Sequence, residues 1–240
     1  MKMHSAVLLP VLLSACGHTP PIGKPELSAN LTSLEGSAPL ACGYEKTVIE
    51  AGKESKSAWN FWRWPDRTET RDGLSRQGEI WRKDTAGRLF YTRLFFPERV
   101  ALEYMPGDLA ATGMTPSWEQ LDAGLLDPRQ LGSKLALLSK KKDSGVELEQ
   151  YSGVPEGVAT EVDWLPALRL PARIAKRFPE REVVLALKEC APLDQAKLPP
   201  VTLHDLDAFR HLDFSDLGDM ESDPAVQRIL ALTGGHDHDH

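Results

Sequence analysis

The chain has 240 residues, a formal charge of −7 at pH 7 and 41% hydrophobic residues, enough for one domain with a sizeable core. The acids are concentrated at the C-terminal end, where residues 194–240 hold ten acids and three bases. No basic patch stands out, and this argues against nucleic acid as a partner.

The first fifteen residues have the organisation of an export signal. Lys2 precedes a short apolar run over 5–13, and the small residues Ser14 and Ala15 stand directly before Cys16. The run is too short to span a bilayer, which needs about 20 apolar residues. We therefore expect residues 1–15 to be a signal peptide. A signal followed by a chance cysteine, or a buried apolar helix, are the alternatives.

The four residues Leu13-Ser14-Ala15-Cys16 resemble the lipobox of bacterial lipoproteins. The resemblance implies that Cys16 is diacylated, that the signal is cut before it, and that the new amino group is acylated too. Several acyl chains give stable anchoring, whereas one binds only marginally. Gly17, and not aspartate, follows Cys16, which in Gram-negative lipoproteins favours the outer membrane. The resemblance thus predicts a palmitate-bearing outer-membrane lipoprotein that faces the periplasm.

Residues 16–41 are expected to be a lipidated tether. They are rich in Pro, Ser and Gly and have no sustained hydrophobic period. Such a composition cannot bury enough apolar surface to order itself. Its role would be to lift the folded domain off the bilayer.

Two cysteines remain in the expected mature chain, Cys42 and Cys190. In an oxidising compartment an even leftover pair most simply forms a disulfide. That bond would tie the start of the folded region to the end of its last strand. Two free buried thiols are the alternative.

Residues 42–193 are predicted to form an antiparallel sheet with one buried face. Apolar and polar residues alternate over 90–96, 100–104, 158–164, 168–174 and 183–187. Turn signals such as Asp72-Gly73, Pro106-Gly107 and Asp143-Ser144-Gly145 separate the strands.

Two short helices are expected near 116–138. The first would follow Thr115-Pro116, and the second would follow Asp127-Pro128 with Leu131, Leu135 and Leu138 along one side. The predicted fold class is therefore mainly β with α, a curved antiparallel sheet or half-barrel with short covering helices.

The acidic extension, residues 194–240, is expected to hold one helix near 223–233 and a His/Asp tail. His236, His238 and His240 alternate with aspartates, and His-rich tracts bind metals. A tail without fixed geometry would bind transition metals weakly and without selectivity. A merely soluble terminus is the alternative. The acids of 213–223 lack the spacing of a calcium loop.

The aromatic run over 59–64 is the most unusual segment of the body. Alternation places Trp62 and Trp64 on one face and Trp59, Phe61 and Arg63 on the other. Either both faces are covered or one face lines an apolar pocket. For the second case the predicted ligand-lining residues are Trp62, Trp64, Leu94, Leu102 and Trp164.

No catalytic motif is found, so we expect no enzyme. The lipobox, the tether and the aromatic-rich antiparallel sheet with short helices together resemble the lipoprotein-localisation factor family. That resemblance implies an unclosed barrel that is lidded by helices and holds acyl chains. The expected function is a non-enzymatic envelope lipoprotein that binds an apolar or lipid-like ligand. The alternative is a structural or accessory lipoprotein with an envelope protein partner, with metal handling by the tail as a variant.

Overall fold

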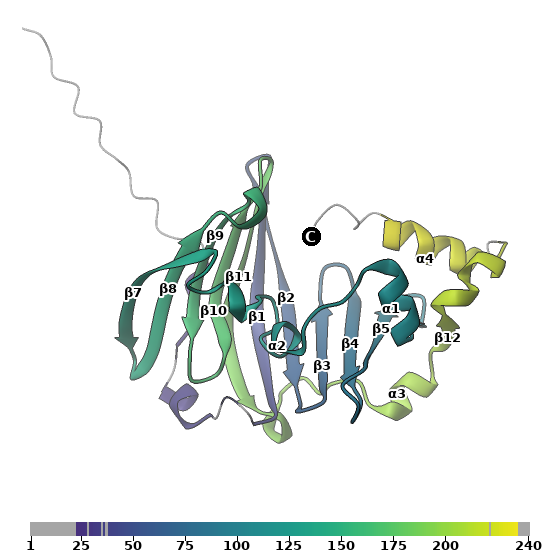
Figure 1. The fold of residues 1–240 in the computed structure, drawn as a ribbon, viewed down its shortest axis with the longest axis horizontal. Helices are drawn as coiled ribbons and strands as arrows, with labels where there is room; N and C mark the ends of the chain where they lie inside the picture. Colours follow the sequence, from purple (N-terminus) through teal and green to yellow (C-terminus); the bar gives the residue numbers. More distant parts are fainter. Residues whose placement is uncertain (1–22, 28, 35, 37, 221, 235–240) are drawn as a thin grey trace, which may run out of the picture.

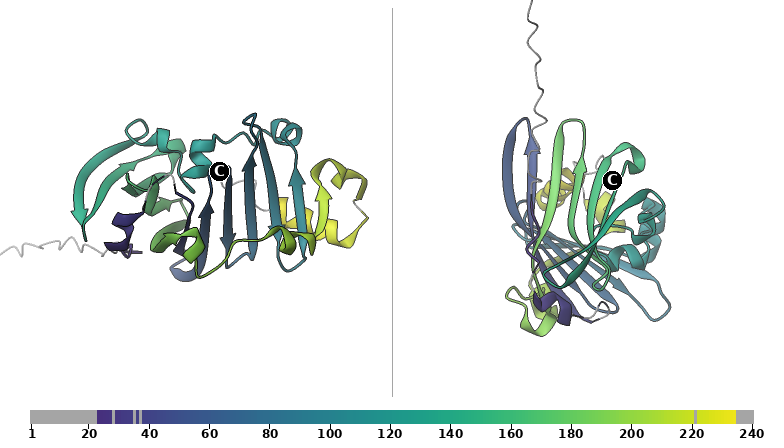
Figure 2. Two further views of the ribbon diagram at one scale, coloured as in Figure 1. Left: turned by 90° about the horizontal axis from the view of Figure 1, so that it is seen from below. Right: turned by 90° about the vertical axis from the view of Figure 1, so that its left-hand side faces the viewer.

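The computed structural model describes residues 23–27, 29–34, 36, 38–220 and 222–234. They form a single curved sheet of twelve strands in the order β12-β6-β5-β4-β3-β2-β1-β11-β10-β9-β8-β7 (Figure 1). Neighbouring strands are antiparallel throughout, except that β12 runs parallel to β6. The sheet is unclosed and strongly curved, and short helices lie over it (Figure 2). The predicted fold class is therefore confirmed.

The strands are β1 (Leu40–Glu50), β2 (Lys53–Arg63), β3 (Arg67–Asp72), β4 (Gln77–Lys83), β5 (Leu89–Phe95), β6 (Val100–Tyr104), β7 (Leu135–Asp143), β8 (Val146–Gly153), β9 (Ala159–Leu165), β10 (Leu170–Arg177), β11 (Arg181–Pro192) and β12 (Arg210–Asp213). The helices and 3-10 turns are η1 (Ala29–Ser33), α1 (Pro106–Thr112), α2 (Trp118–Asp122), η2 (Pro128–Gln130), η3 (Pro155–Gly157), η4 (Leu193–Gln195), α3 (Leu203–Asp207), η5 (Phe214–Met220) and α4 (Pro224–Gly234). In the described part of the chain, no helix has both the length and the apolar character that crossing a bilayer requires.

The two faces of the sheet are covered by different segments. Helices α1, α2 and α4 lie on what we call the inner face (Figure 1). The opposite, outer face is covered by residues 196–209, which we call the strap, and by residues 23–27. Val201 of the strap packs on Ile80, Leu94 and Ala101 of the outer face.

Residues 23–27 lie against the sheet and do not form the expected tether. The amide of Glu26 donates to the carbonyl of Leu187 over 2.9 Å. Gly23 approaches so closely that a Cβ there would lie 2.8 Å from Val184 Cγ1. Further along the same segment, Leu31 of η1 is buried. The expectation of an unpacked tether up to residue 41 is therefore wrong for its described part, because the sheet offers an apolar surface that the segment's own composition does not reveal.

The helix expected after Asp127-Pro128 is replaced by one 3-10 turn and a strand. Asp127 caps the turn as predicted, since its carboxylate accepts from the amide of Arg129. Gly132 then adopts a positive φ of 76°, and β7 begins at Leu135. The prediction of a helical stripe through Leu138 is wrong because β7 pairs with β8 across the hairpin turn at Ser144-Gly145. The helix after Thr115-Pro116 is present as α2, with Ser117 as its N-cap.

The C-terminal extension contributes to the sheet and to its cover. Residues 210–213 join the sheet as β12, and Leu212 and Leu217 are buried in the inner core. Helix α4 agrees with the helix predicted near 223–233 and buries Val226 and Ile229.

The disulfide between Cys42 and Cys190 is present, as predicted. The two residues lie directly opposite each other on the paired strands β1 and β11. These strands stand in the middle of the sheet, so the bond joins segments that are 148 residues apart in sequence at the centre of the molecule.

Candidate functional site

The five predicted ligand-lining residues are not brought together. Trp62 and Leu94 lie on the outer face, whereas Leu102 and Trp164 belong to the two cores of the inner face. Leu94 pairs with Ala101, so Leu102, one residue further on, must point to the opposite face. Trp64 follows β2 and is half-buried. The prediction that these residues line one cavity is therefore wrong, because strand register places them on different faces.

One half of the inner face is filled by aromatic rings. The ring of Trp59 lies 5.5 Å from that of Tyr44 and 6.2 Å from that of Phe61. Ala123 and Leu126, from the segment that follows α2, belong to the same packed cluster. The loop after α2 therefore occupies the space in which a half-barrel would hold a ligand.

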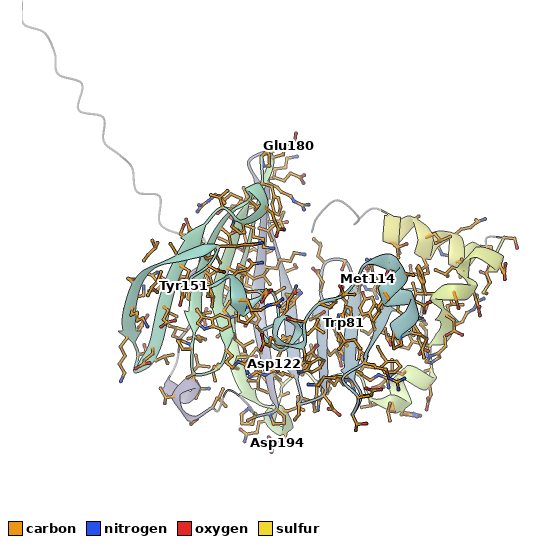
Figure 3. The ribbon with its side chains drawn as sticks, viewed as in Figure 1. Trp81, Met114, Asp122, Tyr151, Glu180 and Asp194 are labelled. Atoms are coloured by element: carbon orange, nitrogen blue, oxygen red, sulfur yellow. A yellow bond between two sulfur atoms is a disulfide. The ribbon has the colours of Figure 1, made fainter. Side chains whose placement is uncertain are left out.

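Arg63 joins three segments beneath this aromatic layer. Its guanidinium is buried and donates to the carbonyls of Asp122, Leu168 and Gly36 over 2.8–3.1 Å. The Asp122 carboxylate lies 3.8 Å from its Nε, and Figure 3 shows Asp122 at the centre of the inner face. Burial lowers the pKa of Arg63, and Asp122 opposes that shift. The sequence placed Arg63 on the face of Trp59 and Phe61 but gave no sign that it is buried.

The other half of the inner face is filled by a second aromatic stack. Ring centroids lie 4.4 Å apart for Trp81 and Tyr91, 5.1 Å for Tyr91 and Tyr104, and 4.5 Å for Tyr104 and Phe214. Met114 packs against this cluster, and Figure 3 shows it above Trp81. Both halves of the inner face are thus closed by side chains.

On the outer face, a buried carboxylate fixes the strap. Glu69 is fully buried and accepts from Arg67 (2.7 Å), from Arg71 (2.8 Å) and from the amide of Val201 (3.0 Å). Burial raises the pKa of Glu69, while the two guanidiniums and the Val201 amide act in the opposite direction. Arg67, Glu69 and Arg71 are two residues apart, a pattern that places three charges on one face of a strand.

Trp62 and Trp64 belong to this outer arrangement. The indole of Trp62 donates to the carbonyl of Leu198 over 3.0 Å, and the Arg71 guanidinium lies 4.8 Å from its ring centroid. Arg67 lies at the same distance over Trp64. Of the two interpretations of the aromatic run, the structure shows the one in which both faces are covered.

Two small cavities of the described residues lie on the outer face. The larger, about 290 Å³, is formed between residues 24–27 and strands β7–β10, and its lining includes Lys141, Glu161 and Arg173. The smaller, about 100 Å³, lies between Trp62 and the strap. Ligand pockets usually measure about 300–1,000 Å³ and are mostly apolar. Neither cavity has the size and lining that an acyl chain requires.

Other candidate groups have structural roles or lie outside the described residues. Among residues 23–27, 29–34, 36, 38–220 and 222–234, no three His, Cys, Asp or Glu side chains are placed to share a metal ion. His211 contacts Glu103 (2.8 Å) and the carbonyl of Leu206 (3.0 Å), which raises its pKa and ties β12 to β6. Cys16 and the tail histidines His236, His238 and His240 lie outside the described residues.

Comparison with known proteins finds similarity only among solved structures. No protein-family model matches the chain, and no curated protein does. PNGF-II is 8% identical, with a TM-score of 0.43 over 78% of this chain and 33% of its own. MucB is 14% identical, with a TM-score of 0.38 over 75% and 59%. The chain thus spans about a third of PNGF-II and about three fifths of MucB.

A third similar structure is an outer membrane lipoprotein-sorting protein domain from Vibrio parahaemolyticus. It is 10% identical, with a TM-score of 0.34 over 74% of this chain and 92% of its own. The TM-scores of these three structures lie between 0.34 and 0.43.

Proposed function

We propose that the chain is a non-enzymatic envelope lipoprotein, anchored through Cys16, with a structural or accessory role. The observation that carries this proposal is the filled inner face. A carrier of acyl chains needs a concave apolar space that can exclude water from the chain it binds. Here the aromatic clusters around Phe61 and Tyr91 occupy that face.

The body is also cross-linked in a way that suits a fixed component of an assembly. The disulfide joins β1 to β11, Arg63 ties the inner-face loops to the sheet, and Glu69 ties the strap to the outer face. A ligand-binding half-barrel would have to open one of these covers, and each opening would leave buried charges or carbonyls unpaired. The expected partner is another protein of the envelope.

The uptake of a fluorescent fatty acid separates this role from that of a carrier. We expect the delipidated wild-type protein to show no saturable uptake, because the inner face has no room for the chain. Leu126→Ala, which removes most of a buried side chain from the cover of the inner face, is the control and should show no saturable uptake either, because the space that it opens is far smaller than an acyl chain. One-to-one saturable uptake by the wild type would contradict the accessory role and restore the carrier function.

Lipidation is tested separately by metabolic labelling with palmitate. We expect the wild type to incorporate the label and Cys16→Ser to lose it, because the acylated side chain is absent. Processing by the signal peptidase should fail in the same variant. Equal labelling of the two proteins would show that the anchor lies elsewhere.

A further inference from the structure

Strand β7, at one end of the sheet, exposes two adjacent leucines. Every residue of this strand after Leu135 is exposed, with 44% of Leu137 and 68% of Leu138 accessible. Lys140, Lys141 and Lys142 follow. Lysines on an edge strand discourage pairing with other strands. That role does not explain why both leucines are held in water.

The described chain begins at Gly23 on strand β11, and its next residue reaches the cavity beside β7. Lys24 lines the same cavity as Leu138 and Lys141. Only residues 17–22 separate Cys16 from the packed Gly23. Eight residue steps from Cys16 to Lys24 span at most about 29 Å even when fully extended. The lipid anchor is therefore held close to β7.

The opposite end of the sheet is much further from the anchor. Strands β7 and β12 are the two ends of the twelve-stranded order, as Figure 1 shows. Eleven strand spacings of about 4.8 Å place them about 53 Å apart along the sheet. The segment that leads to the anchor packs on β11, which is four strands from β7 and seven from β12, so the anchor lies nearer to the β7 end.

The distribution of charge also favours the β7 end, and not the β12 end, as the one that lies near an anionic membrane. Near β7, basic and acidic side chains are balanced, and Lys140 Nζ lies 2.6 Å from Glu149. The bases are Lys24, Lys140, Lys141, Lys142 and Arg173, and the acids are Asp143, Glu147, Glu149, Glu161 and Asp163. At the other end, Asp213, Asp216 and Asp219 are exposed in an extension with ten acids and three bases. Anionic headgroups attract lysines near a membrane surface and repel such an acidic end.

We propose that the β7 edge, with Leu137 and Lys142 on one side of the strand and Lys24, Leu138 and Lys141 on the other, docks edge-on against the headgroup layer of the bilayer that holds the Cys16 acyl chains. The leucines enter the interface and the lysines contact lipid phosphates. The β12 end then points away from the membrane. This inference rests on the lipidation of Cys16 that the proposed function requires.

Site-specific fluorescence in the lipidated full chain tests the docking. Leu138→Cys carries an environment-sensitive fluorophore, and the protein is reconstituted in phosphatidylethanolamine–phosphatidylglycerol vesicles that contain quencher-labelled lipid. The matched control is Leu230→Cys on α4, an exposed leucine near the β12 end. We expect a blue shift and loss of most of the fluorescence at position 138, and neither at position 230. Lys141→Glu together with Lys142→Glu should weaken the quenching at 138, whereas Lys53→Glu on the β1–β2 hairpin should not.

A vesicle flotation assay distinguishes a failure of the lipid anchor from a failure of the docking. Protein that does not float with the vesicles lacks the anchor, which overturns the proposed function and the docking together. Protein that floats but is unquenched at position 138, or is quenched equally at 138 and 230, keeps its anchor and overturns the docking alone.

Discussion

Replacing Trp62 with glutamate should destabilise the protein by about 3–5 kcal/mol, the range for losing a buried aromatic ring or breaking a buried ion pair. Only 1% of Trp62 is exposed, and its indole donates to the carbonyl of Leu198. In the β2–β3 ladder it lies opposite Glu69, so the new carboxylate would compete with Glu69 for Arg67 and Arg71. Thermal or urea unfolding measures the loss.

Leu203→Glu is the matched control for this variant. Leu203 belongs to the same strap region but is 75% exposed, so the added charge stays in water and the melting temperature should hardly change. A Trp62→Glu protein as stable as the control would show that Trp62 stands in an open site that water can enter, and the ligand-lining prediction for that residue would return.

Reduction of the disulfide should lower the free energy of unfolding by about 5 kcal/mol, because the chain-entropy model gives this value for a closed loop of about 150 residues. The bond between Cys42 and Cys190 closes a loop of 148 residues, so the reduced unfolded chain gains much more freedom than the native sheet. Urea unfolding with and without reductant measures the difference, and reoxidation should restore the original midpoint.

The double variant Cys42→Ala/Cys190→Ala should reproduce the effect of reduction, with a small added loss of packing because both side chains are buried. Two alkylatable thiols in freshly purified protein, or an unchanged unfolding midpoint after full reduction, would contradict this prediction.

Local alternation was enough to predict the strands that appear as β5, β6, β9, β10 and β11, and the faces of the residues in the aromatic run of β2. Trp59, Phe61 and Arg63 share one face and Trp62 the other, as the period of two requires. The sequence also contained the cysteine pair, the helix near 223–233 that appears as α4, and the acidic end. Each of these features depends on neighbouring residues or on cysteine chemistry alone, and for that reason the sequence sufficed.

The tertiary structure decided what covers the sheet and where the cavities lie. Residues 135–143 carry a helical leucine spacing, yet pairing with β8 makes them a strand, since a ladder of backbone hydrogen bonds outweighs weak local preference. Gly23, Leu31 and the strap find apolar surface only once distant strands have assembled. The pairing register of β5 and β6 places Leu94 and Leu102 on opposite faces of the sheet. The inner face is filled by side chains from segments that meet only in the folded chain. The sequence by itself thus determined the strands with clear alternation, the faces of their residues and the disulfide, whereas the filled inner face and the exposed β7 edge arise from contacts between residues far apart in the chain.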